Sequence, residues 1–112
     1  NTAMNRVFID QSGFEYIRYL SAEPRMKYVD GEATNEQDRD DNGTPLFGIV
    51  CLAKQKGATK PETITVKVAL PQEPQIAEFS PIGFVGLTAL AYNSGNRAQL
   101  AFSAEKMGKT KE

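Results

Sequence analysis

The side chains that most often carry out catalysis are scarce in this chain of 112 residues. It contains no histidine, and its single cysteine, Cys51, falls within an apolar run. Without histidine there is no His-based triad, no His/Cys zinc site and no imidazole general base. A lone cysteine in apolar surroundings packs as a small hydrophobe. We therefore predict a protein that is not an enzyme and uses no cofactor, with Cys51 buried in the core.

One acidic stretch resembles the start of a calcium loop. Residues 38–43 read D-R-D-D-N-G, which places oxygen ligands at Asp38, Asp40 and Asn42 before a glycine. The match then fails, because Ile49 occupies the position of the bidentate glutamate and no flanking helices are expected. The stretch is a weak calcium candidate, and the alternative is an acidic loop that leads into a strand.

Charge is unevenly spread along the chain. Residues 30–41 hold six acidic side chains and one basic side chain, a net charge of −5, whereas the whole chain has a net charge of −1. The remainder therefore carries +4. An asymmetry of this kind is a weak indication of a surface that faces nucleic acid, because the total charge is far from that of a strongly basic DNA-binding protein.

Basic and aromatic side chains occur on or beside the expected strands. The basic set is Arg18, Arg25, Lys27, Lys54, Lys56, Lys60, Lys67 and Arg97, and the aromatic set is Tyr16, Tyr19, Tyr28, Phe47 and Tyr92. A positively charged groove with stacking aromatic rings is how small barrels hold single strands. The alternative is that the tyrosines fill the core and the lysines solubilise turns.

Within these sets we select candidate nucleic-acid-binding residues. Those expected to meet phosphates are Arg18, Lys27, Lys54, Lys67 and Arg97. Tyr28 and Phe47 are expected to stack on bases, on the condition that their faces are exposed.

The rest of the pattern predicts an all-β fold. Segments with strand composition are 14–21, 25–29, 46–53, 62–70, 81–92 and 97–104. The segment 46–53 is apolar on both faces, so it must be covered on both sides rather than lie at a solvated edge. We predict a small antiparallel barrel of five to six strands, similar to an oligonucleotide-binding (OB) fold, with one long acidic loop at 30–43. Gly83 and Gly86 are expected to bend the strand that contains them.

The length indicates one domain. We expect an N-terminal arm at 1–13, a barrel domain at 14–105 and a flexible tail at 106–112. The chain begins N-T-A-M, so we interpret Asn1–Ala3 as vector-derived residues before a natural start at Met4. No segment has the composition of a signal peptide or a membrane span, and an unpaired cysteine fits a reducing cytoplasm.

Five short blocks, in order, resemble a known family. They are E-P-R-M-K-Y-V-D-G, D-R-D-D-N-G-T-P-L-F-G-I-V-C-L-A-K, I-T-V-K-V, F-S-P-I-G-F-V-G-L-T-A-L-A-Y and L-A-F-S-A-E. Over about residues 14–105 the chain resembles the plasmid replication, integration and excision activators, small proteins of actinobacterial plasmids and integrative elements. The resemblance also extends to small barrel proteins of conjugative elements that assist helicases and replication proteins. It carries over no catalytic residue.

We therefore predict an accessory DNA-processing protein of a mobile element. It would bind single-stranded DNA, or a replication or conjugation protein, without catalysis and away from membranes. The alternative is a protein-interaction module that docks a basic partner through the acidic loop at 30–41 and has no affinity for nucleic acid. A hydrolase is a third possibility, but no paired-carboxylate spacing supports it.

Overall fold

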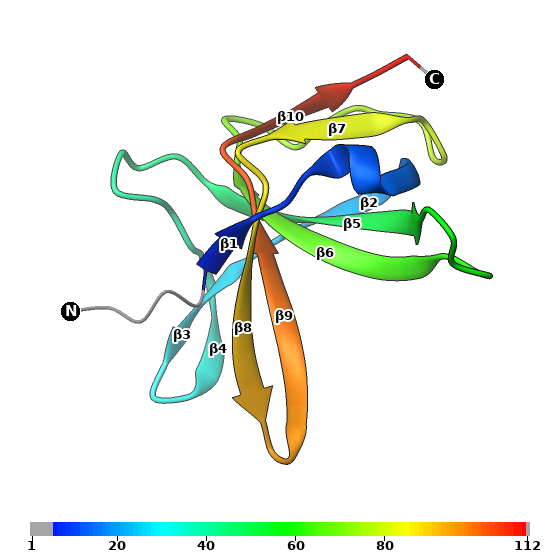
Figure 1. The fold of residues 1–112 in the computed structure, drawn as a ribbon. Coiled ribbons are helices and arrows are strands. Elements are labelled where there is room, and N and C mark those ends of the chain that lie inside the picture. The colour runs from blue at the N-terminus through cyan, green and yellow to red at the C-terminus, as the bar shows by residue number, and fades with distance from the viewer. Residues whose placement is uncertain (1–5, 112) are drawn as a thin grey trace.

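The computed structural model describes residues 6–111, and these residues are mostly in strands (Figure 1). The strands are β1 (Arg6–Phe8), β2 (Phe14–Pro24), β3 (Met26–Val29), β4 (Glu32–Gln37), β5 (Leu46–Gln55), β6 (Glu62–Ala69), β7 (Ile82–Val85), β8 (Thr88–Ser94), β9 (Arg97–Ser103) and β10 (Lys106–Lys109). A short 3-10 turn, η1 (Gln11–Gly13), precedes β2. Within 6–111, no helix is long and apolar enough to cross a membrane. The predicted all-β class is confirmed, and Asn1–Ala3 lie outside the described residues.

Six strands form the main sheet, in the order β1-β8-β9-β6-β5-β2. Most neighbours are antiparallel, but β6 and β9 run parallel where Val66 and Lys67 pair with Phe102 and Ser103. The prediction of a wholly antiparallel sheet is wrong at this pair. Two smaller antiparallel sheets pair β7 with β10 and β3 with β4.

The sheet edge at β2 approaches the segment that leads into β7. Arg18 and Pro81 form an isolated bridge, and two backbone hydrogen bonds add to it, from Tyr19 N to Ser80 O (2.9 Å) and from Phe79 N to Tyr19 O (2.6 Å). Within residues 6–111 no continuous ladder joins these edges, so the sheets do not close into a barrel. What is observed is a mixed β-sheet with partial contact between its edges.

The core gathers around β5, which lies between β2 and β6 as an interior strand. This placement confirms the prediction that the strand is not a solvated edge. The side chains of Ile49 and Cys51 are fully buried, and Phe47 is 5% exposed. Burial raises the pKa of the Cys51 thiol to about 12, since a thiolate would lose its hydration there. Cys51 is a core residue, as expected. Phe47 fails its condition for base stacking, because its ring packs in the core.

The acidic segment is more ordered than predicted. Residues 32–37 form β4, which pairs with β3 through a two-residue turn at Asp30 and Gly31. Both turn residues have positive φ (53° and 83°), as in a type I′ hairpin turn, where Asp-Gly is favoured. The prediction of a structureless loop over 30–43 was wrong, because local turn chemistry nucleates a hairpin within polar sequence.

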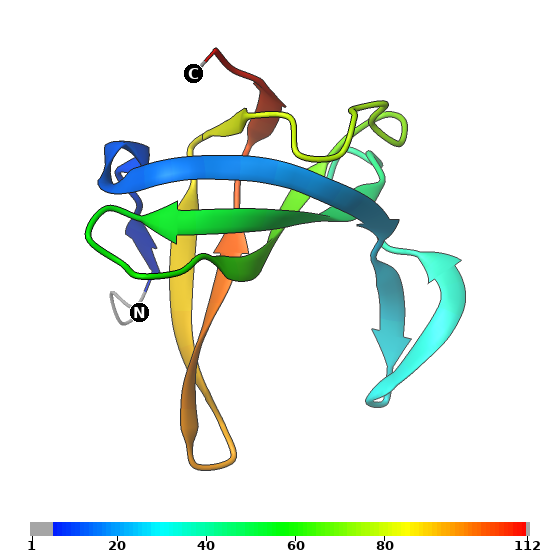
Figure 2. The ribbon, with the colours of Figure 1, turned by 90° about the vertical axis from the view of Figure 1, so that its right-hand side faces the viewer.

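Two hairpins extend from the same side of the sheet, β3–β4 and β8–β9 (Figure 2). The β8–β9 hairpin turns at Gly95 and Asn96, with a φ of +65° at Gly95. The predicted bend lies at Gly86, where a φ of +66° separates β7 from β8. The segment from residue 106 was expected to be a flexible tail, but it forms β10 on β7, and β1 likewise pairs with β8.

Candidate nucleic-acid interface

Strand alternation gives the β2–β5–β6 part of the sheet two different faces. The inner face packs on the core with side chains such as Ile17, Ile49 and Val66. The opposite face, called the outer face below, is defined by the register of the three strands. Its residues are Tyr16, Arg18, Ser21 and Glu23 of β2, Gly48, Val50, Leu52 and Lys54 of β5, and Thr63, Thr65 and Lys67 of β6.

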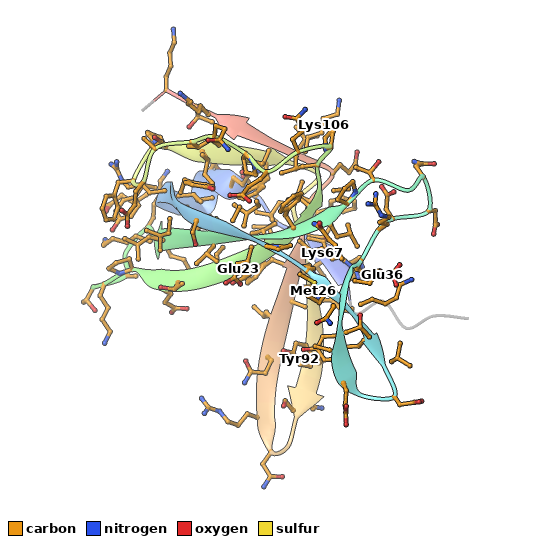
Figure 3. The ribbon with its side chains drawn as sticks, turned by 180° about the vertical axis from the view of Figure 1, so that it is seen from behind. Glu23, Met26, Glu36, Lys67, Tyr92 and Lys106 are labelled. Atoms are coloured by element: carbon orange, nitrogen blue, oxygen red, sulfur yellow. The ribbon has the colours of Figure 1, made fainter. Side chains whose placement is uncertain are left out.

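Three of the predicted phosphate-binding residues lie on this outer face, with Lys54 and Lys67 toward opposite ends of it. Arg18 pairs in register with Leu52, Lys54 lies opposite Tyr16, and Lys67 lies opposite Gly48. The Lys54 ammonium is 3.0 Å from Glu15 Oε1. That carboxylate is largely exposed, so the ion pair is weak and can exchange for a phosphate. Glu23 is the acidic member of the face, and it lies in the same row as Gly48 and Lys67 (Figure 3).

A fourth cation, Arg25, lies near Gly48 at the margin of the outer face. A Cβ placed on Gly48 would lie 3.0 Å from Thr65 Cγ2 and 3.9 Å from Arg25 Cγ. The tight neighbour of Gly48 is therefore Thr65, and the aliphatic stem of Arg25 lies at ordinary van der Waals distance. Arg25 and Lys67 line the same groove.

A groove of about 710 Å³ runs along β6 beside the outer face and extends to the β8–β9 hairpin. It opens because β6 and β9 pair only at the two positions given above and then diverge. Its charged lining residues are Arg6, Arg25, Lys60, Lys67 and Glu62, which is four cations against one acid. Phe14, Phe102 and Tyr92 also line it, and Tyr92 is 47% exposed. An excess of positive charge beside exposed aromatic area is the combination that retains unpaired nucleotides.

Arg6 is fixed at the wall of the groove by the neighbouring strands. Its Nη1 donates to Thr88 Oγ1 at 3.0 Å and to Ser103 Oγ at 3.4 Å. These neutral acceptors orient the guanidinium without neutralising it, so its charge stays available to an anion.

The remaining predicted residues lie elsewhere. Lys27 and Tyr28 are on the β3–β4 hairpin, where Lys27 Nζ is 3.7 Å from Glu36 Oε2 and Tyr28 is 68% exposed. Arg97 is at the turn end of the β8–β9 hairpin. The structure thus gathers three of the seven predicted residues on one face, places three on the flanking hairpins and buries Phe47.

Sequence reasoning missed part of the site. Arg25, Lys60 and Tyr92 belong to the wider basic and aromatic set but were not among the selected residues. Arg6 was set aside with the N-terminal arm.

The calcium candidate has a different use in the structure. Asp40 Oδ1 accepts hydrogen bonds from Asn42 N and Thr44 N, both at 2.9 Å, and Asp38 Oδ1 accepts one from Arg39 N. These carboxylates cap backbone amides of a turn. Over residues 6–111, no group of three or more acidic, thiol or imidazole side chains is arranged to hold a metal ion.

The comparisons with known proteins leave the family undetermined. No protein-family model matches the chain, and no significant match is found among curated proteins or solved structures. The resemblance to plasmid replication, integration and excision activators therefore stays a prediction, and a function has to be inferred from the site itself.

Proposed function

We propose that this protein binds single-stranded DNA across the outer face and along the adjoining groove, without catalysis. The observation that carries the proposal is the lining of the groove, where four cations face one acid beside the exposed ring of Tyr92. Cations hold the phosphates, and an aromatic ring accepts any base because every base has a π-face.

The strand path supports the same proposal. Strands β2, β5 and β6 form an antiparallel meander, and β9 runs parallel to β6. Strands β7 and β8 pair with β10 and β9, and the segment before β7 contacts β2 through the Arg18–Pro81 bridge. We propose that this is the path of a partly open OB fold, with β3–β4 in its first connection and β8–β9 in its last. In OB folds the face of the second and third strands, flanked by these two connections, binds oligonucleotides. Here that face is the β5–β6 part of the outer face.

The cellular role follows from the resemblance rather than from the site. On that basis we propose an accessory role in the DNA processing of a mobile element, in which the protein would cover a single strand or present it to a replication protein. The cytoplasmic setting and the absence of catalysis belong to this same proposal.

A matched pair of charge-reversal variants tests the proposal. We expect wild-type protein to bind a labelled thymidine oligonucleotide of about 15 residues more tightly than the duplex form, as measured by fluorescence anisotropy. Arg25→Glu with Lys67→Glu should weaken this binding by at least about tenfold. The control variant, Lys106→Glu with Lys109→Glu, changes the net charge by the same amount. Its substitutions are on β10, away from Lys67 (Figure 3), so it should bind nearly as tightly as wild type. Equal losses in both variants, or no binding by wild type, would contradict the proposal.

The protein-interaction alternative has one favourable observation. The β3–β4 hairpin protrudes from the sheet and carries the exposed acids Asp30, Glu32 and Glu36 (Figure 2). If this hairpin docks a basic partner, wild-type protein should capture a polylysine probe and should not bind DNA. The triple variant Asp30→Asn, Glu32→Gln, Glu36→Gln should then lose capture of the probe. Capture that survives these substitutions would exclude the alternative.

A further inference from the structure

One residue of the fold has a backbone conformation that its side chain does not favour. Among the described residues, Asp30 and Phe79 have positive φ without being glycine. Asp30 lies in an Asp-Gly hairpin turn, where this conformation is usual. Phe79, with a φ of +72°, is a bulky residue for which the left-handed region is a genuine outlier. Glycine or asparagine would be accommodated at this position with less strain.

The Phe79 backbone is held in this conformation by neighbouring groups. Its N–H donates to Tyr19 O at 2.6 Å, and its carbonyl oxygen accepts a hydrogen bond from Arg18 Nη1 at 3.2 Å. The next residue, Ser80, accepts from Tyr19 N at 2.9 Å. These bonds attach the segment to the edge of β2, which it follows in Figure 2. The strained conformation is thus built into the structure rather than left to a free loop.

The side chain itself does little for the core. Phe79 is 53% exposed, and it is not among the residues that form or pack against the hydrophobic core. Backbone strain that is maintained while an aromatic ring stays in solvent indicates a functional use of that ring. A stability role would predict a buried ring instead.

The surroundings of Phe79 indicate which ligand it serves. The Arg18 guanidinium that bonds its carbonyl lies 5.0 Å from the centroid of the Tyr16 ring. Tyr16 and Arg18 are members of the outer face. We propose that Phe79 is a stacking platform for an unpaired nucleobase at the β2 end of the outer face, with Arg18 beside the adjacent phosphate. This inference deepens the proposed function and rests on it.

The distance across the sheet sets the expected footprint. Neighbouring strands lie about 4.8 Å apart. From the Phe79 segment to β2, from β2 to β5 and from β5 to β6 are three such spacings, or roughly 14 Å. At about 3.4 Å or more per nucleotide, on the order of four nucleotides cover this span. A single strand that crosses the outer face from the groove therefore reaches Phe79.

Two readouts with opposite expectations test the inference. Phe79→Asn accepts the left-handed backbone, so the midpoint of thermal unfolding should stay level or rise. Affinity for the same labelled thymidine oligonucleotide should fall about 5- to 150-fold, the range measured for losing one stacked base. Phe79→Trp should retain most of the affinity because it keeps an aromatic face. Val85→Asn removes a similarly exposed apolar side chain from β7 and should bind as wild type does.

Three outcomes would contradict the inference that Phe79 stacks on a nucleobase. If Phe79→Asn binds as tightly as wild type while the Arg25→Glu, Lys67→Glu variant is impaired, the stacking platform is refuted and the proposed function stands. If Phe79→Asn loses thermal stability together with affinity, the ring has a packing role and the inference also fails. If wild type binds no single-stranded DNA, the proposed function falls and the inference falls with it.

Discussion

The two faces of β5 differ in how deeply their side chains are buried and in the types of side chain they carry. The inner face, with Phe47, Ile49 and Cys51, is buried and apolar. The outer face of the same strand has Gly48, Val50, Leu52 and Lys54, whose side chains are half-buried or, at Gly48, absent. One strand thus supports the core on one side and, on the other, forms the middle of a face whose cations come from all three strands. Substitutions on the two sides should therefore separate stability from binding.

The largest expected effect is on the inner side. Ile49 is fully buried, so Ile49→Ala removes buried methyl and methylene groups and leaves a cavity. We expect the free energy of unfolding to fall by about 2–5 kcal/mol, as measured by urea denaturation. Val50→Ala, one residue along on the outer face, should cost less than half as much. Equal losses at the two positions would show that the outer face is packed like the core.

The next effect separates the two hairpins that flank the outer face. Tyr92 lines the basic groove, whereas Tyr28 is on the hairpin that carries the acidic residues. We expect Tyr92→Ala to weaken binding of single-stranded DNA by about 1–3 kcal/mol. Tyr28→Ala should weaken it less, because the acids near Tyr28 repel phosphates. The measurement is anisotropy at one fixed salt concentration, and a larger loss at Tyr28 would reverse the assigned path of the strand.

The fold could be predicted from the sequence where alternation is strong. Ile64, Val66 and Val68 alternate with polar residues, and the strand they predict at 62–70 contains the observed β6. The acidic hairpin escaped prediction because β4 has almost no apolar residue, and its strand depends on an Asp-Gly turn and pairing with β3. The parallel β6–β9 pair could not be predicted either, because long-range pairing leaves no local pattern.

The candidate site was predictable only in part, for a related reason. Residue type and strand position place Arg18, Lys54 and Lys67 on one face once the register is known. Arg25 follows β2 directly, and its place in the groove beside Lys67 depends on the three-dimensional path of the chain. Phe47 was misjudged because both faces of its strand are apolar in sequence, and the pattern does not say which one is inside.

A smaller, pH-dependent effect tests the inner face again. The pKa of Cys51 is about 12 in the folded protein, above the value of about 8.5 expected in the unfolded chain. Only the unfolded chain therefore releases this proton readily, so the contribution to stability is intact below about pH 8.5 and is lost as pH rises toward 12. The loss should approach 1.4 kcal/mol per pH unit. In urea unfolding at pH 7, 9 and 10, wild type should lose more stability than Cys51→Ala, whereas parallel curves would contradict the burial of the thiol.

The smallest effect concerns the acidic hairpin. Neutralising its acids with Asp30→Asn, Glu32→Gln and Glu36→Gln removes repulsion between this hairpin and a bound strand. We expect affinity for single-stranded DNA to rise about two- to fivefold at low salt and to converge with that of wild type at high salt. A decrease in affinity would show that these acids contact the ligand directly.

The central claim is that basic side chains on the outer face and in the groove hold the phosphates of a single strand. The most direct test is the affinity for a labelled thymidine oligonucleotide over a series of salt concentrations. With about four phosphate contacts, log K should fall with log salt at a slope of about −3, and the Arg25→Glu, Lys67→Glu variant should reduce this slope by about 1.4. A slope near zero in wild type, or no binding even at low salt, would contradict the claim.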